Sequence, residues 1–148
     1  MYKVILLPVD LNRLDEQKGA LAQAVTIAHM NKAVLHVAGV LPDYGMSIVG
    51  SFFPENFEQK MLAEAGERLT EWCAKTLPKD LEVHEHVLKG TIYEEILQAS
   101  RRLGVDLIVM TAHRPDLKDY LLGPNAARVV RHADCSVLVV RGKNSGGA

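Results

Sequence analysis

The chain has 148 residues, of which 48% are apolar and 24% are charged, and its formal net charge is -1. This length fits one domain with a sizeable core, and the balanced charge favours neither disorder nor a nucleic-acid partner. The two cysteines, Cys73 and Cys135, belong to no Cys-x-x-Cys or Cys/His cluster, so neither a disulfide framework nor a zinc site is indicated.

Apolar runs and helical patterns alternate along the chain. Short runs rich in β-branched residues are typical of buried strands, and apolar positions three and four apart are typical of helices. Strands are predicted over residues 3–9, 33–41, 81–88, 106–111 and 136–140, and helices over residues 14–29, 57–76, 92–103 and 125–132. Residues 41–54 form an unusually long loop that mixes Gly, Pro and aromatic residues, which makes it a candidate lid or partner surface.

This alternation predicts βαβ units and a doubly wound α/β fold with a parallel sheet. We expect one domain over residues 1–142 and a disordered tail over residues 143–148. In such sheets a ligand binds beyond the carboxyl ends of the strands, where the strand order reverses. That rule places Asp10, residues 37–41 and residues 111–125 around one crevice.

The chain is expected to be a cytoplasmic protein without membrane insertion. The opening apolar run from Val4 to Pro8 is too short for a signal sequence. No later run approaches the roughly 20 apolar residues of a membrane span. A reducing compartment also suits the two isolated cysteines.

Several segments resemble the universal stress protein family, and the resemblance covers essentially the whole chain. They are ILLPVD at residues 5–10, VLHV at 34–37, DLIVM at 106–110, and LLG followed by VVRHADCSVLVV at 121–140. The likeness is greatest to the F/G-type subgroup. It implies a five-stranded parallel sheet of order 3-2-1-4-5, the adenine nucleotide alpha hydrolase-like fold, and ATP binding in a stress-response or signalling module.

The nucleotide loop of that family, G-x-x-G-x9-G-[S/T], is only partly matched. Its first two glycines fall on Thr111 and Arg114, the spacer is one residue shorter, and the final pair becomes Gly123-Pro124. Pro124 cannot donate a hydrogen bond, but the backbone N–H groups of Asn125 and Ala126 remain, and the start of a helix attracts phosphate. We therefore expect nucleotide binding with weaker phosphate contacts than in the glycine-loop members.

The resemblance also assigns the rest of the site. It places Asp10 near the ribose or a metal ion, Pro8 and Val9 on the adenine wall, and the backbone of Val37 at the adenine edge. The expected ligand is ATP, with Mg²⁺, ADP or AMP as further possibilities. The complete set of expected nucleotide-binding residues is Pro8, Val9, Asp10, Val37, Met110, Thr111, His113, Arg114, Gly123, Pro124, Asn125 and Ala126.

The residues themselves leave structural alternatives open. Asp10 also suits a carboxylate that ends a strand and caps the next turn. His36 and His113 suit hydrogen-bonded structural residues beside apolar strands. His84 and His86 lie two apart and would face the same way on a strand, but no third ligand is near in sequence, so solvated edge residues are expected there.

The sequence shows no catalytic motif and leaves the status of an enzyme open. It lacks G-x-x-x-x-G-K-[ST], G-x-S-x-G and H-E-x-x-H, and no positioned general base is visible. At most slow ATP hydrolysis or self-phosphorylation is expected. The alternative function is a nucleotide-free dimeric adaptor that contacts a protein partner. In either case, strand 136–140 would lie at a sheet edge and pair with its copy in a homodimer.

Overall fold

The computed structural model describes residues 1–42, 56–112 and 123–141. The predicted loop at residues 41–54 and the tail at 143–148 fall almost entirely outside these residues. Every described strand and helix begins and ends within about two residues of its predicted position, except that the helix predicted from residue 14 begins at Lys18, after a short 3-10 helix over residues 14–17. The elements are β1 (Val4–Val9), η1 (Leu14–Gln17), α1 (Lys18–Asn31), β2 (Val34–Pro42), α3 (Phe57–Thr76), β3 (Val83–Gly90), α4 (Ile92–Arg102), β4 (Leu107–Ala112), α5 (Gly123–His132) and β5 (Ser136–Arg141).

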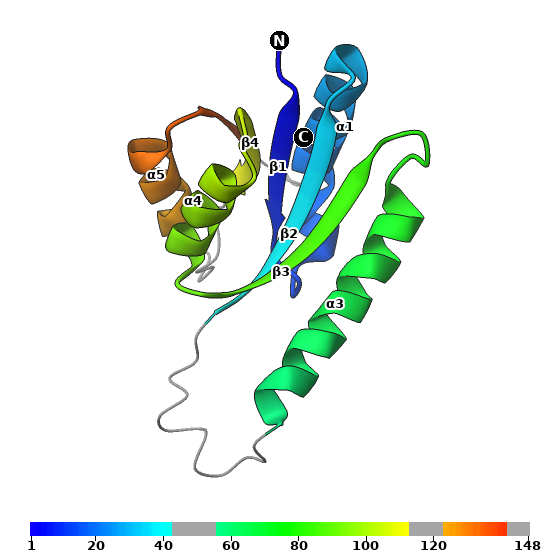
Figure 1. Ribbon diagram of the computed structural model, residues 1–148, viewed down its shortest axis with the longest axis vertical. Helices are drawn as coiled ribbons and strands as arrows, with labels where there is room; N and C mark the ends of the chain where they lie inside the picture. The colour runs from blue at the N-terminus through cyan, green and yellow to red at the C-terminus, as the bar shows by residue number, and fades with distance from the viewer. Residues whose placement is uncertain (43–55, 113–122, 142–148) are drawn as a thin grey trace, which may run out of the picture.

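The five strands form one parallel sheet in the order β3-β2-β1-β4-β5 (Figure 1). The chain first builds outward from β1 through β2 to β3, and then crosses to the other side of β1 for β4 and β5. The reversal of strand order therefore lies between β1 and β4. This arrangement confirms the predicted doubly wound fold and its strand order.

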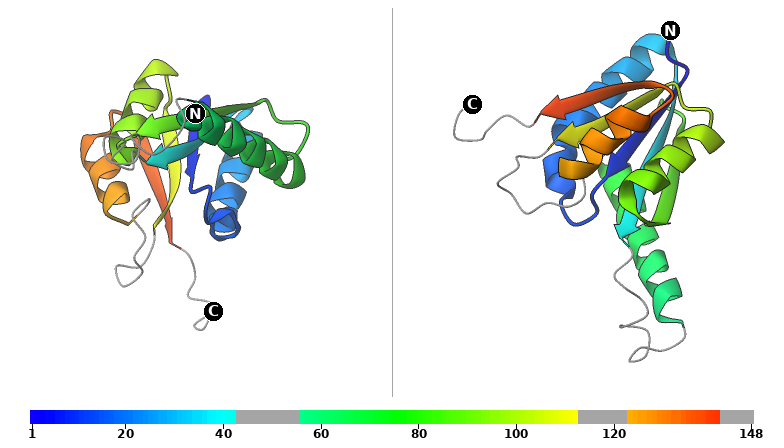
Figure 2. Two further views of the ribbon diagram at one scale, coloured as in Figure 1. Left: turned by 90° about the horizontal axis from the view of Figure 1, so that it is seen from below. Right: turned by 90° about the vertical axis from the view of Figure 1, so that its left-hand side faces the viewer.

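Helices cover both faces of the sheet, with α1 and α3 on one side and α4 and α5 on the other (Figures 1 and 2). Alternate residues of each strand divide between two cores. Ile5, Leu7 and Val37 belong to the core under α1 and α3, whereas Leu6 and Met110 belong to the core under α4 and α5. Because both faces are covered, the inner strands are continuous apolar runs.

The edge strands carry a different pattern from the central ones. In β1 five of the six residues are buried, whereas in β3 only Leu88 is buried. A strand at the sheet edge is paired on one side only and is less completely covered by helices, so polar side chains are tolerated there. The strand β3 ends at Gly90, whose φ of +138° is the conformation that only glycine adopts readily, and α4 follows directly.

Candidate functional site

The carboxyl ends of β1, β2 and β4 meet at one edge of the sheet, as the sequence predicted. Asp10 follows β1 directly, Val9 lies beside Gly39 of β2 in the parallel register, and Thr111 is close to the end of β4. The start of α5 lies on the same side, because Asn125 contacts Tyr93 at the beginning of α4, which follows the carboxyl end of β3. These elements surround the point where the strand order reverses.

Four of the predicted nucleotide-binding side chains are part of the hydrophobic core. Val9 and Val37 are fully buried in the core under α1 and α3, and Met110 and Ala126 are buried in the core under α4 and α5. A side chain that is packed on all sides has no surface left for a polar ligand. These positions can therefore offer only their backbone groups or an apolar wall.

Asp10 is held in place by the turn that follows β1. The residue is 9% exposed, and its Oδ1 accepts a hydrogen bond of 2.9 Å from the backbone N–H of Asn12. Its carbonyl accepts a second hydrogen bond, of 3.0 Å, from the N–H of Arg13. The predicted capping role is therefore present, and it also fixes the direction of the carboxylate.

The segment between β1 and α1 is anchored by contacts that the sequence reasoning missed. The side chain of Leu11 is 4% exposed and packs against Gly39, where an added Cβ would lie 2.9 Å from it. Arg68 of α3 donates a hydrogen bond to the carbonyl of Leu11. The absence of a side chain at Gly39 thus lets this segment lie close to β2.

Gln17 joins this segment to β4. Its side chain is fully buried, its Nε2 donates to the carbonyl of Arg13 at 3.2 Å, and its Oε1 accepts from the Thr111 hydroxyl at 3.3 Å. Thr111 stands where the family loop has its first glycine, and its hydroxyl is used within the protein. The sequence did carry a signal, because helical spacing places Gln17 on the same face as Ala20 and Leu21.

The first turn of α5 offers backbone groups rather than side chains. Pro124 is exposed in this turn, where a missing N–H costs no intrahelical hydrogen bond. The side chain of Asn125 points to α4, since its Oδ1 accepts a hydrogen bond of 3.1 Å from the N–H of Tyr93. Ala126 is buried. The predicted residues His113 and Arg114 lie outside the described residues.

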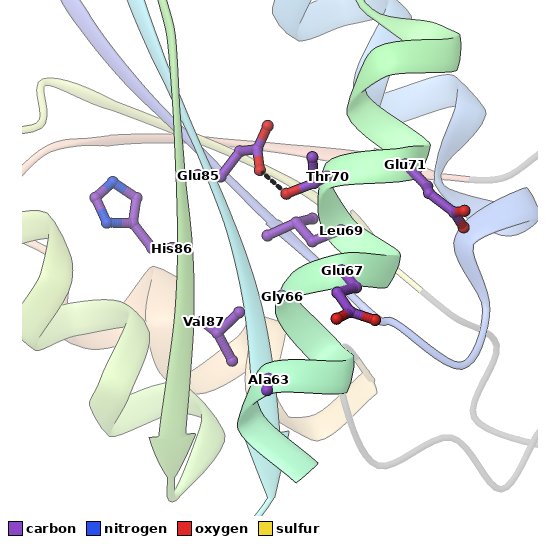
Figure 3. Close-up of a pocket in the computed structure, with 9 residues that line it drawn as sticks. All are labelled: Ala63, Gly66, Glu67, Leu69, Thr70, Glu71, Glu85, His86 and Val87. Carbon is purple, nitrogen blue, oxygen red and sulfur yellow. Dashed lines mark hydrogen bonds between the residues drawn. The ribbon is translucent and has the colours of Figure 1, made fainter. Parts of the chain in front are cut away.

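A groove of about 710 Å³ lies elsewhere, between α3 and the edge strand β3 (Figure 3). Across it the hydroxyl of Thr70 donates to Glu85 at 2.5 Å. None of the predicted nucleotide-binding residues lines this groove, so it is separate from the site predicted at the carboxyl ends of the strands. Its lining residues are Ala63, Gly66, Glu67, Leu69, Thr70, Glu71, Glu85, His86 and Val87.

Within residues 1–42, 56–112 and 123–141, no group of three or more His, Cys, Asp or Glu side chains is arranged to hold a metal ion. In the same part of the chain, no helix is both long enough and apolar enough to cross a membrane. His36 is a hydrogen-bonded residue, as predicted, and its partner is His86.

The fold is that of a doubly wound α/β domain whose strand order reverses between β1 and β4. The sequence profile of the Universal stress protein family matches residues 1–141, and the chain belongs to that family. It is 32% identical to Universal stress protein G of Shigella flexneri, with 95% of this chain and all of that protein covered.

Solved structures agree with this assignment. The hypothetical protein MJ0577 is 27% identical to the chain and superimposes with a TM-score of 0.79, covering 98% of this chain and 99% of that one. Two universal stress proteins, one solved in complex with cAMP and one from Archaeoglobus fulgidus with dAMP, are 21% and 18% identical to the chain, each with a TM-score of 0.57. The match to the cAMP complex covers 96% of this chain, and the match to the dAMP complex covers 94%. Each match covers 98% of the other protein's chain. These likenesses establish the adenine nucleotide alpha hydrolase-like fold.

Proposed function

We propose that the chain binds an adenine nucleotide, with ATP as the expected ligand, at the carboxyl edge of the sheet. The observation that carries this proposal is the meeting of the β1 and β4 ends with the opening turn of α5 at the strand-order reversal. Nucleotides bind at such switch points in parallel α/β sheets. The protein would act as a stress-response or signalling module in the cytoplasm, with little or no turnover.

The crevice supplies groups for each part of a nucleotide. Pro8 and Val9, both buried, would form the apolar wall against the adenine, and the backbone of Val37 would read its edge. The fixed carboxylate of Asp10 would accept hydrogen bonds from the ribose hydroxyls or coordinate Mg²⁺. We keep Thr111, through its backbone, and Met110 as parts of the floor beneath the ligand.

The phosphates would lie against the first turn of α5. The backbone N–H groups at a helix start point outward and carry a partial positive charge, which favours an anion. Asn125 and Ala126 would contribute these donors, and Gly123 would let the backbone approach the phosphates closely. His113 and Arg114 complete the proposed site, Arg114 as a cation toward the phosphates.

The comparisons support an adenine-containing ligand. Two universal stress proteins of the same fold hold cAMP and dAMP, respectively. Both ligands share the adenine base and one phosphate group, which are the two features that the wall at Val9 and the amides of α5 would recognise. The preference among ATP, ADP and AMP then depends on how many phosphates the α5 turn accommodates.

The substitution Gly123→Val tests this proposal. A branched side chain at the start of α5 would occupy the space of the phosphates, so we expect at least about tenfold weaker ATP binding, the loss of one charge-assisted hydrogen bond or more. Calorimetry with ATP and Mg²⁺ measures the affinity for ATP, and the circular dichroism spectrum is the control for folding. A folded variant with the affinity of the parent would show that the crevice is not the site.

A second substitution, Pro124→Ser, tests whether the backbone N–H that proline lacks matters for binding. Serine would restore one backbone N–H and one hydroxyl, each worth about 1.5 to 3 kcal/mol toward a charged group when undisturbed. We expect tighter ATP binding than in the parent by the same calorimetric titration. Unchanged or weaker binding would place the phosphates elsewhere.

A second candidate function is a nucleotide-free dimeric adaptor. The observation that favours it is that polar side chains of the proposed site already form hydrogen bonds within the protein. Asn125 is bonded to Tyr93 of α4, and Thr111 is bonded to Gln17. Mass spectrometry of the native purified protein separates the two functions. Copurified adenine nucleotide supports the first, whereas a ligand-free protein that also fails to bind added ATP supports the adaptor.

A further inference from the structure

Three histidines of two neighbouring strands gather on one face of the sheet, away from the nucleotide crevice. His36 lies near the amino end of β2 and pairs in register with His84 of β3, and His86 follows two residues later. The next residues on this face, Ala38 and Leu88, belong to the core under α4 and α5. We call His36, His84 and His86 the histidine cluster.

The rings of the cluster are in direct contact. Nδ1 of His36 lies 2.8 Å from Nε2 of His86, and the ring centroid of His36 is 5.1 Å from that of His84 and 5.0 Å from that of His86. Figure 3 shows His86 pointing to the opposite side of β3 from Glu85. A hydrogen bond between two ring nitrogens needs one N–H and one bare nitrogen, so it cannot exist when both rings are protonated.

The charged groups around the cluster oppose protonation more than they support it. On the sheet, Glu82 acts on His36 but is exposed and already pairs with His84 at 2.7 Å. From α4, the guanidinium of Arg102 acts on His86. No carboxylate among the described residues forms an ion pair with His36 or His86.

The pKa values follow from these surroundings. Burial first, and then the charges of His86 and His84, lower the pKa of His36 below its ordinary value, against the opposing effect of Glu82. Burial, then Arg102 and His84, lower the pKa of His86. Both groups are thus neutral at neutral pH, which is the state that the ring-to-ring hydrogen bond requires.

We propose that the histidine cluster is a proton-sensitive clasp, which holds the edge strand β3 to β2 at neutral pH and loosens it in acid. The strand β3 is the element that would yield. It is an edge strand with one buried residue, whereas five of the six residues of β1 are buried. Loosening β3 also removes the surface on which α3 packs through Val87.

The sign of the pH effect follows from the direction of the shifts. The pKa values of His36 and His86 in the folded protein lie below the unfolded value of about 6.5. Above that pH neither the folded nor the unfolded protein binds these protons, so the stability that the clasp contributes is fully present. As the pH falls through about 6.5, the unfolded or opened state binds protons first, and stability is lost. The loss is complete below the folded pKa values.

Hydrogen exchange of the full chain tests the clasp, measured by mass spectrometry at about pH 7.5 and about pH 5.0 and corrected for intrinsic exchange rates. From pH 7.5 to pH 5.0 we expect the opening equilibrium of β3 to rise about two- to twelvefold more in the parent than in a variant without the clasp, the factor that one hydrogen bond of ordinary net strength is worth. A chelator in all samples removes metal ions, because histidine side chains are common metal ligands. No acid-induced rise in the opening of β3, or a rise no larger than in that variant, would overturn the proposal.

Two variants isolate the cluster. His86→Gln is that variant: it keeps a hydrogen-bonding side chain but cannot be protonated, so the acid-induced rise in the opening of β3 should be smaller than in the parent. His132→Gln is the matched control, since His132 is an exposed residue at the end of α5, and it should behave as the parent. A parental response in His86→Gln would contradict the clasp.

Side-chain NMR titration of the unmodified protein needs no variant. His36 and His86 should titrate below the ordinary histidine value of about 6.5. Titration of both rings at or above that value would overturn the proposal even if every variant failed to fold.

Discussion

At the scale of single residues, the structure separates side chains that could meet a ligand from those that are used by the fold. Asp10 is both buried and bonded to its own turn, so its carboxylate is fixed before any ligand arrives. Asn125 and Thr111 belong to the proposed site, yet their side chains bond to Tyr93 and Gln17. The ligand contacts that we propose at the α5 turn are therefore mainly with the backbone.

Cys73 yields a prediction at this scale. Burial, and secondarily the charge of Glu85, raises the pKa of its thiol to about 12, so almost no reactive thiolate exists near neutral pH. In the variant Cys135→Ser, which retains Cys73 as its single thiol, we expect reaction with a disulfide reagent at pH 8 to be at least about a hundredfold slower in the native than in the unfolded protein. Rapid labelling of the native variant would show that Cys73 is accessible.

At the scale of elements, α4 and α5 are joined at their amino ends. Thr91 occupies the N-cap position of α4 but makes no side-chain capping hydrogen bond, and Asn125 of α5 supplies one to Tyr93 instead. The guanidinium of Arg128 also lies 4.9 Å from the ring centroid of Tyr93. The helix α5, whose first turn is the proposed phosphate site, thus also stabilises the start of α4.

Asn125→Ala tests this cap. It leaves the N–H of Tyr93 without its side-chain acceptor, and we expect a loss of about 0.5 to 2 kcal/mol in the free energy of unfolding, the usual effect of removing a cap. Urea denaturation measures it. Thr91→Ala is the control at the N-cap position itself and should change the stability by a few tenths of a kcal/mol or less, since that hydroxyl caps nothing. Equal losses in both variants would contradict the cap.

At the scale of the whole molecule, β5 is the edge opposite β3 and carries apolar, half-buried residues from Val137 to Val140. In the described part of the chain it pairs only with β4. An apolar strand with an open edge invites a further strand, and we propose that its copy pairs with it across a two-fold axis.

Val139→Lys is expected to convert that dimer into a monomer. Near a two-fold axis the two lysines would face each other, and like charges opposite one another destabilise strand pairing. Sedimentation of the parent should give twice the 16.3 kDa of one chain, and that of the variant the mass of a single chain. Val130→Lys, at a residue that is 53% exposed on α5, is the control and should remain dimeric. A monomeric parent, or a dimeric Val139→Lys variant, would refute this interface.

The local pattern of the sequence determined the elements and the fold class. The continuous apolar run at residues 4–9 and the helical spacing at residues 57–76 each describe one element, and such periodicity needs no knowledge of its neighbours. The alternation of strands and helices then restricts the topology to parallel crossovers. The strand order 3-2-1-4-5 came from the family resemblance, and the structure confirms it.

Only the tertiary structure decided which side chains became partners. Thr111 and Gln17 are 94 residues apart, Asn125 and Tyr93 are 32 apart, and His36 and His86 are 50 apart. These pairs depend on strand register and on how helices dock, because a shift of one residue would turn each strand side chain to the other face. The sequence therefore predicted His84 and His86 on one face, but the third histidine beside them became visible only when β2 and β3 were paired in register.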